Sequence, residues 1–253
     1  MAFLKACFTN ILDFILPPHC IICHSLVQNA GWLCSSCFKG LDFISEPFCV
    51  RCGQPFESYE IAGSDHICAD CLNKPPLWEQ ARAAFLYNEK FKRLILPLKY
   101  ADRQASIPFL AYFMSRISGP LLDKTDIIIP VPLHKKRLQE RKYNQSALIA
   151  WKLGKKAKKR VIADALIRHC QTQPLGHLTK PERKNILKNA IIVRDKYKDI
   201  LMDKNILLID DVMTTGSTLE ECCSALLGIK GIKINILVAG LVSHKHQYND
   251  LDS

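Results

Sequence analysis

The distribution of apolar positions divides the chain into an irregular N-terminal part and a regular remainder. Runs of mainly branched or aromatic apolar residues predict strands at residues 81–87, 126–133, 206–209 and 232–242. Runs without alternation are typical of strands covered on both faces, as in α/β sheets. Helical segments are expected at 91–100, with a break near Pro97, after Gln145 with an end within 151–160, and at 219–227. The pattern therefore predicts an α/β fold.

Two carboxylates and a loop rich in hydroxyl groups follow the strand run at 206–209. The carboxylates are Asp210 and Asp211, and the loop consists of Thr214, Thr215, Gly216, Ser217 and Thr218. Backbone N–H groups at a helix start lack intrahelical partners and lie at the positive end of the helix dipole, so strand, loop and helix in this order form an anion site. Gly216 permits close backbone approach to an oxyanion. The plainer alternative is a buried strand, an acidic turn and a helix cap.

A cationic segment follows the strand run at 126–133. Five Lys or Arg side chains fall within residues 135–142. Ligands of open α/β sheets bind at the carboxyl ends of strands, so a loop here would meet a diphosphate. Arg137 and Arg141 are four residues apart and could share a helix face, and guanidinium groups suit phosphate oxygens. The alternative is an ordinary charged helix start.

The positive charge of the chain is unevenly distributed. The formal net charge is +11, yet residues 1–79 contain 4 Lys or Arg against 8 Asp or Glu, and residues 80–253 contain 31 against 16. The basic character therefore belongs to the part with the anion loop. This favours polyanionic partners, such as a pyrophosphate substrate, nucleic acid or both.

The densest cationic patch directly follows Trp151. It consists of Lys152, Lys155, Lys156, Lys158, Lys159 and Arg160. Backbone phosphates bind such patches in a salt-dependent way, and an aromatic ring can stack on an unpaired base, so single-stranded DNA is a candidate partner. The alternative is a solvated helix face with Trp151 in the core.

Eight of the twelve cysteines form four Cys-x-x-Cys pairs before residue 72. The pairs are Cys20/Cys23, Cys34/Cys37, Cys49/Cys52 and Cys68/Cys71. Two pairs close a tetrahedral Cys₄ shell around Zn²⁺, and regular pairs without a secretory signal favour metal over disulfides. We expect structural zinc in one or two sites, because a closed shell leaves no open position for catalysis. Sequential and crossed pairings both stay open, as do a redox dithiol and an iron–sulfur cluster.

The first sixteen residues read as an amphipathic helix that packs on the protein, with attachment to a membrane surface as the alternative. Lys5 and Asp13 interrupt this segment, and it is too short to span a bilayer. No transmembrane segment is expected elsewhere. Pro75 and Pro76 end the cysteine-rich part. We therefore expect two domains, residues 1–78 and 79–253, in a cytoplasmic protein that lies near the inner face of the membrane if the first helix attaches there.

The stretch 206–219 resembles the signature of the type I phosphoribosyltransferases. The resemblance implies a parallel sheet flanked by helices. It also implies that Asp210 and Asp211 hold the ribose 2′ and 3′ hydroxyls of phosphoribosyl pyrophosphate, that the hydroxyl loop holds its 5′-phosphate, and that Mg²⁺ accompanies the diphosphate.

The order of motifs along nearly the whole chain resembles the ComF family, which joins a zinc-binding module to a type I phosphoribosyltransferase domain. The motifs are the cysteine pairs, Ala84-Phe85, Leu98-Lys99-Tyr100, residues 130–134, Arg137-x-x-x-Arg141-x-x-Asn144-Gln145 and residues 210–218. The resemblance implies a role in natural transformation, the import and handling of single-stranded DNA. It adds Lys99 as a substrate contact, and a helicase-like competence partner could dock on the N-terminal module.

One segment matches the family pattern incompletely. Arg168 and Thr172 match, but Leu175 stands at the family's Gln position and Ile186 at its Asn position. In related folds this segment closes over the substrate. Binding of phosphoribosyl pyrophosphate is therefore expected, and turnover stays open. The alternative is a non-catalytic competence factor that binds single-stranded DNA or senses a ligand.

Overall fold

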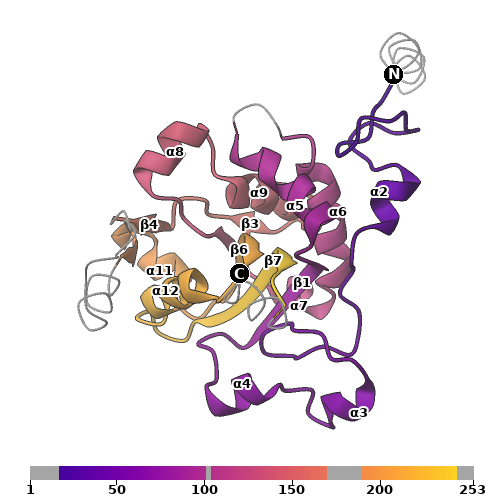
Figure 1. Cartoon of the computed structure of the whole chain (residues 1–253). Coiled ribbons are helices and arrows are strands. Elements are labelled where there is room, and N and C mark those ends of the chain that lie inside the picture. The colour runs from indigo at the N-terminus through magenta and orange to yellow at the C-terminus, as the bar shows by residue number, and fades with distance from the viewer. Residues whose placement is uncertain (1–16, 101–103, 170–189, 244–253) are drawn as a thin grey trace, which may run out of the picture.

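The computed structural model of the chain describes residues 17–100, 104–169 and 190–243 (Figure 1). The predicted N-terminal helix and the incompletely matched segment from Thr172 to Ile186 lie outside these residues. Within the described ranges, no helix is long and apolar enough to cross a membrane.

A five-stranded parallel sheet forms the centre of the larger part of the molecule. Its strand order is β1 (Gln80–Leu86), β7 (Lys233–Leu241), β6 (Asn205–Met213), β2 (Ile127–Pro130) and β3 (Arg160–Val161). The four predicted strand runs all fall in this sheet, so the predicted α/β fold is confirmed. Because the strands run in one direction, their carboxyl ends lie along one edge, where α/β proteins bind ligands.

Helices cover both faces of the sheet, because alternate strand residues point to opposite sides. Ile128 and Leu207 pack on one side, and Ile129 and Leu208 on the other. The first side is covered by α5 (Glu89–Ile95), η1 (Leu96–Lys99), α6 (Ile107–Ile117), α7 (Pro120–Lys124) and α9 (Gln145–Ala157). The second side is covered by α12 (Ser217–Leu226), η2 (Asp195–Tyr197), α11 (Lys198–Leu201) and the antiparallel pair β4 (Leu166–Arg168) and β5 (Ile191–Val193). The exposed helix α8 (Lys135–Arg141) follows β2.

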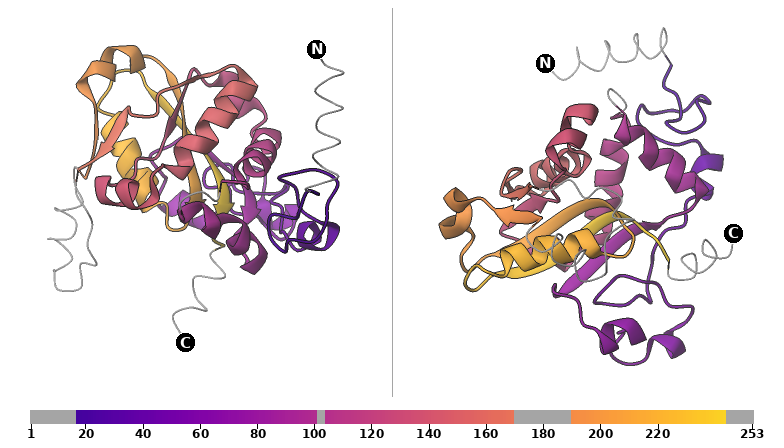
Figure 2. Two further views of the ribbon diagram at one scale, coloured as in Figure 1. Left: turned by 90° about the horizontal axis from the view of Figure 1, so that it is seen from above. Right: turned by 60° about the vertical axis from the view of Figure 1, so that its left-hand side comes forward.

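The cysteine-rich module has two parts that pack at different places, as Figures 1 and 2 show. The first part, residues 17–40, contains α2 (Ser35–Lys39) and lies beside α6, where the Trp32 ring centroid is 5.8 Å from that of Phe109. The second part, residues 46–73, contains α3 (Tyr59–Ala62) and α4 (Ala69–Asn73). It lies beside β1, where Arg82 Nη1 donates to the Val50 carbonyl.

Some boundaries differ from the sequence-based prediction. Strand β6 continues to Met213, because residues 210, 212 and 213 pair with β7, so the two carboxylates lie within the strand, whereas the sequence predicted them after its end. Helix α12 begins at Ser217, two residues earlier than predicted, because Gly216 caps it in a left-handed conformation. The cationic segment is a helix and not a loop. Trp151 is 52% exposed, so the alternative prediction, which placed its side chain in the core, is wrong.

Candidate functional site

A cavity of about 360 Å³ opens at the carboxyl edge of the sheet. Its wall includes Lys99, Arg137, Arg141, Asp210, Asp211, Thr214 and Thr218. These residues come from three motifs that are far apart in the sequence. The cavity has the size of a small-molecule site, for which about 300–1,000 Å³ is usual. The fold therefore brings the anion loop, the paired acids and the cationic segment to one place.

The paired carboxylates of the cavity are held by nearby donors. Asp210 Oδ1 accepts hydrogen bonds from the Ser146 hydroxyl and from the Asp211 N–H, both at 2.9 Å. Asp211 Oδ1 accepts from the Val212 N–H at 2.8 Å. Burial, together with the neighbouring Asp211 carboxylate, raises the pKa of Asp210 well above its ordinary value. A ligand that donates hydroxyl groups to this pair would stabilise its negative charge.

The hydroxyl loop encloses a separate hollow of about 60 Å³ beside the acids, lined by Asp210 and residues 212–219. Gly216 has a φ of 76° and precedes the ten-residue helix α12, whose first N–H groups lack intrahelical partners. The hydroxyl oxygens of Thr215 and Ser217 are 2.8 Å apart. A Cβ atom on Gly216 would lie only 3.2 Å from Trp78 Cη2. The loop is therefore packed on one side and offers donors on the other.

The cationic helix α8 presents Arg137 and Arg141 to the cavity from one face, as their spacing predicts. The His134 side chain caps the start of the helix. Beyond its end, Asn144 Nδ2 donates to the Val131 carbonyl at 2.9 Å. This bond holds the segment after α8 against the end of β2, and it therefore helps to fix the position of the helix that presents the two guanidinium groups.

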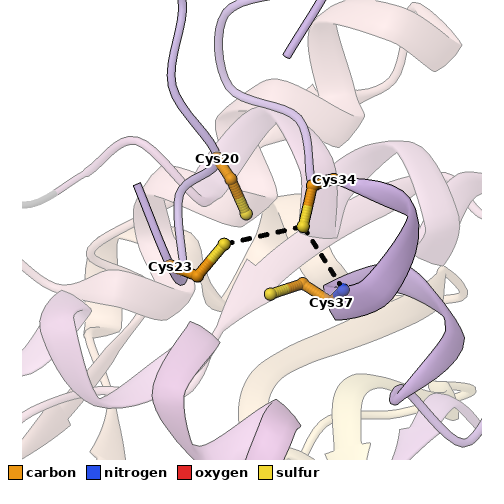
Figure 3. A group of neighbouring side chains, drawn as sticks. All are labelled: Cys20, Cys23, Cys34 and Cys37. Carbon is orange, nitrogen blue, oxygen red and sulfur yellow. Dashed lines mark hydrogen bonds between the residues drawn. The ribbon is translucent and has the colours of Figure 1, made fainter. Parts of the chain in front are cut away.

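The cysteines gather in two groups of four, and the sequential pairing is confirmed. The groups are Cys20, Cys23, Cys34 and Cys37 (Figure 3), and Cys49, Cys52, Cys68 and Cys71. The sulfur atoms of each group lie within 4.8 Å of one another, with Cys23 Sγ 3.5 Å from Cys34 Sγ and Cys52 Sγ 3.7 Å from Cys68 Sγ. A tetrahedral ion with Zn–S bonds of about 2.3 Å needs sulfurs about 3.8 Å apart. Both groups therefore fit Zn²⁺.

Comparisons with known proteins agree with this arrangement. Residues 11–80 match the double zinc ribbon domain family, which together with the two Cys₄ groups supports structural zinc. Competence protein F of Haemophilus influenzae is 30% identical over 223 residues, which cover 85% of this chain and 94% of that protein. The chain belongs to the ComF family. The DNA utilization protein YhgH of Escherichia coli O6:H1 is 29% identical over 221 residues, which cover 84% of this chain and 92% of that protein.

Solved structures match this ComF protein only weakly over the whole fold. A hypoxanthine phosphoribosyltransferase of Staphylococcus aureus has a TM-score of 0.34 at 15% identity, and the match covers 56% of this chain and 75% of that chain.

Several cavity residues of this ComF protein were not assigned to the site from the sequence. Arg168 lines the cavity from β4, and its Nη2 lies 3.9 Å from Glu221 Oε2. Gln145 is 1% exposed, and its side-chain nitrogen has no hydrogen-bond partner among the described residues. Tyr87 and Ser146 also line the cavity. Arg168 and Gln145 stood in family motifs that could have indicated them, whereas nothing local marks Tyr87.

The predicted nucleic-acid patch at residues 152–160 lies at the other end of α9 from the cavity. A helix of this length spans roughly 19 Å, and its first residues line the cavity. Lys156 Nζ hydrogen-bonds to Ser115 Oγ at 2.7 Å, and Lys159 Nζ donates to the Asp123 carbonyl at 2.8 Å. The patch is therefore a second surface of the ComF protein, and part of its charge already has protein partners.

Proposed function

We propose that the cavity binds phosphoribosyl pyrophosphate together with Mg²⁺. One observation carries the proposal: a single cavity is lined by the paired carboxylates, by Thr214 and Thr218 of the hydroxyl loop at a helix N-terminus, and by two arginines of one helix face. These groups are complementary to a ribose diol, a 5′-phosphate and a diphosphate. The resemblance of residues 206–219 to the phosphoribosyltransferase signature supports the same three assignments.

The acids and the loop would hold the sugar phosphate. Asp210 and Asp211 would accept hydrogen bonds from the 2′ and 3′ hydroxyls of the ribose. Thr214, Thr218 and the first N–H groups of α12 would donate to the 5′-phosphate. The raised pKa of Asp210 supports this assignment, because hydroxyl donors relieve the cost of two adjacent negative charges.

The cationic wall would bind the leaving group of a phosphoribosyl transfer. Arg137 and Arg141 would stabilise the negative charge that develops on departing pyrophosphate, and Lys99 adds a further cation at the same cavity. The carboxylates of Asp210 and Asp211 are hard oxygen donors of the kind that Mg²⁺ prefers. When bound, Mg²⁺ supplies charge neutralisation on the diphosphate.

We place this ligand within DNA uptake, where the molecule to be handled is single-stranded DNA. The names of the relatives, competence protein F and DNA utilization protein YhgH, support this setting. The cationic patch at residues 152–160 is a candidate binding surface for the single-stranded DNA. A helicase-like partner of the N-terminal module stays a prediction, for which the exposed Tyr59, Ile61 and Leu72 of the second ribbon offer an apolar surface.

Calorimetric titration with phosphoribosyl pyrophosphate and Mg²⁺ tests the proposal. Loss of hydrogen bonds to a charged group amounts to about 1.5–3 kcal/mol, so Asp211→Asn should weaken binding by about tenfold or more. Asp199→Asn, an exposed Asp on α11, is the matched control and should bind as the wild type does. No binding by the wild type, or equal binding by Asp211→Asn, would contradict the proposal. A panel of acceptors with detection of released pyrophosphate then decides whether binding leads to transfer.

A further inference from the structure

Helix α8 lines a second hollow, a groove of about 560 Å³, with a face that the candidate site does not use. Arg137 and Arg141 line the cavity, whereas Lys135, Leu138 and Lys142 line the groove. The three groove residues are spaced by three and four, so they form one stripe along the helix. The groove is therefore separate from the cavity, although α8 contributes to both.

The inner surface of the groove is mostly aliphatic. Its aliphatic lining residues are Leu133, Leu138, Ala147, Leu148, Leu166 and Ile167. A single indole, that of Trp151, joins them from α9. Leu138 is 42% exposed and Trp151 is 52% exposed. Apolar side chains that stay exposed together in a concave surface gain free energy when a partner covers them.

The charges around this apolar surface are mainly positive. Four cations line the groove: Lys135, Lys142, Arg168 and Arg194. Asp164 is the only acid among the described lining residues, and it already lies 3.7 Å from Arg194 Nη1 and 3.1 Å from Lys196 Nζ. Neither Lys135 nor Lys142 has an ion pair within the described residues. Two lysines of α8 are therefore available to carboxylates of a partner.

The stripe on α8 defines the pattern that a partner must match. Lys135 and Lys142 are seven residues apart, which is roughly 10 Å along a helix, and Leu138 lies between them. A partner helix brings residues seven apart back to the same face at the same distance. In an extended segment, residues about 10 Å apart are three positions apart and point to opposite faces. The stripe therefore favours a helix with two acids on one face and apolar residues between them.

We propose that the groove is a docking site for an acidic amphipathic helix of a partner protein. Its acids would pair with Lys135 and Lys142, and its apolar residues would cover Leu138, Leu148 and Trp151. Binding of an amphipathic helix in an apolar groove is a common mode of peptide recognition, and complementary charges at the rim select the partner.

The lining favours a peptide over a nucleic acid. Successive bases of a single strand need successive aromatic faces, and its backbone needs a continuous line of cations. The groove offers one indole among aliphatic side chains, and Leu138 separates the two available lysines. The inference does not depend on the ligand of the cavity. Pro132, Leu133 and Arg168 line both hollows, so a docked helix would lie against the wall of the candidate site.

Fluorescence anisotropy with a labelled synthetic helix of about 14 residues, or about four turns, tests the groove. The probe carries two Glu seven residues apart, Leu and Phe at the third and fourth positions after the first Glu, and Ala elsewhere to favour the helix. The wild-type protein should bind it saturably. A scrambled peptide of the same composition, and a peptide with Ser in place of Leu and Phe, should each bind at least about tenfold more weakly.

Substitutions in the protein should locate the binding. Leu138→Ala should weaken it by more than about fivefold, because a Leu side chain is no longer buried. Leu227→Ala, at a leucine that is 45% exposed on another surface, is the matched control and should bind as the wild type does. Trp151→Ala should weaken binding by about tenfold or more.

A reversal of charge makes the test independent of small losses of stability. Lys135→Glu/Lys142→Glu should lose the Glu peptide and bind a peptide with Lys at both Glu positions instead. Lys204→Glu/Lys230→Glu changes the charge equally at exposed lysines before β6 and β7, and should keep the preference of the wild type.

Four results would overturn the inference. These are absence of binding by the wild type, equal affinity for the scrambled peptide, equal losses in Leu138→Ala and Leu227→Ala, and an unchanged preference in Lys135→Glu/Lys142→Glu. Binding of an oligothymidylate that weakens in Trp151→Ala, while the peptide fails to bind, would assign the groove to a single strand and would also overturn it.

Discussion

The two zinc ribbons have the same ligands but are connected to the rest of the molecule in different ways. The first ribbon packs on α6 through aromatic rings: the centroid of Trp32 lies 5.5 Å from that of Tyr112, and Phe38 lies 5.9 Å from Phe113. Cys23, one of its four ligands, is exposed. This ribbon lies beside α6, a helix on the same side of the sheet as α5 and α9 (Figure 1).

The second ribbon is tied by hydrogen bonds to Trp78 and to a residue of the cavity wall after β7. The indole Nε1 of Trp78 donates to the Arg51 carbonyl at 2.7 Å, and Gln54 Nε2 donates to the carbonyl of the cavity residue Val242 at 2.8 Å. Trp78 itself packs under Gly216 of the loop. Identical Cys₄ chemistry therefore serves two purposes in this protein. The first ribbon adds a surface, and the second supports the candidate site.

The largest effect should come from removing one zinc at a time. Cys49→Ser/Cys52→Ser and Cys20→Ser/Cys23→Ser should each lose one of the two ions, because metal binding supplies most of the folding free energy of such small modules. Only the first variant should lose affinity for phosphoribosyl pyrophosphate, by more than about tenfold, with less than about twofold in the second. Zinc analysis and calorimetry measure both quantities. Equal losses of affinity would remove the distinction between the ribbons.

Replacing the tryptophan that contacts each ribbon should also affect ligand binding only at the second ribbon. Trp78 is 5% exposed and Trp32 is 39% exposed. Trp78→Ala should lower the free energy of unfolding by about 3–5 kcal/mol and weaken ligand binding. Trp32→Ala should cost about 1–2 kcal/mol and leave binding unchanged. Denaturant unfolding followed by ligand titration checks both variants. A larger loss of stability in Trp32→Ala than in Trp78→Ala would contradict the different roles of the two ribbons.

The pH dependence of stability reports on the site that the second ribbon supports. Because the pKa of Asp210 is raised in the folded state, the folded protein keeps this proton to higher pH than the unfolded chain does. Stability should therefore fall as the pH rises from about 4, the unfolded pKa, to the folded pKa. Asp210→Asn should abolish this fall and be more stable than the wild type at neutral pH. Asp199→Asn is the control.

The pH dependence of stability should differ between the variants of the two ribbons. The fall should persist in Cys20→Ser/Cys23→Ser, where the cavity is untouched. It should become smaller in Cys49→Ser/Cys52→Ser, because loss of the support beside Val242 would let water reach the carboxylates. A wild-type stability that rises over this pH range would show that Asp210 is not the group responsible.

The smallest expected effect concerns two glycines with the same backbone conformation. Gly216 and Gly31 have φ angles of 76° and 78°, so alanine should cost about 1–2 kcal/mol at either position. At Gly31 the nearest atom to a Cβ is the Ala105 carbonyl oxygen at 3.6 Å, an ordinary contact, whereas at Gly216 it is Trp78 at 3.2 Å. Thermal unfolding should show the larger loss for Gly216→Ala. Equal losses of stability would mean that the Trp78 ring moves away from the new Cβ atom without further cost.

Local patterns were sufficient to predict much of this molecule. Apolar runs predicted four of the five strands of the sheet, all except the short β3, and the four-residue spacing of Arg137 and Arg141 predicted a shared helix face, from which both line the cavity. The regular cysteine pairs predicted two tetrahedral groups without deciding the pairing. In each case the signal lies within one element or one short repeat, where spacing alone fixes geometry.

Contacts between distant segments could not be predicted in this way. The position of Trp78 against the hydroxyl loop depends on how the second ribbon folds back on β1, about 140 residues before the loop. The continuation of β6 through Asp210 depends on pairing with β7. Whether Trp151 is buried depends on which neighbours α9 meets, and its amphipathic sequence permits either outcome. Such features follow from tertiary packing, which overrides local preference.

A crystal structure of the protein with phosphoribosyl pyrophosphate and Mg²⁺ would test the proposed ligand site directly. We expect the 5′-phosphate at the N–H groups of residues 214–218, the ribose hydroxyls at Asp210 and Asp211, and the diphosphate beside Arg137 and Arg141. Ligand density in another part of the molecule, or a ligand in this cavity with its diphosphate at the hydroxyl loop, would contradict it.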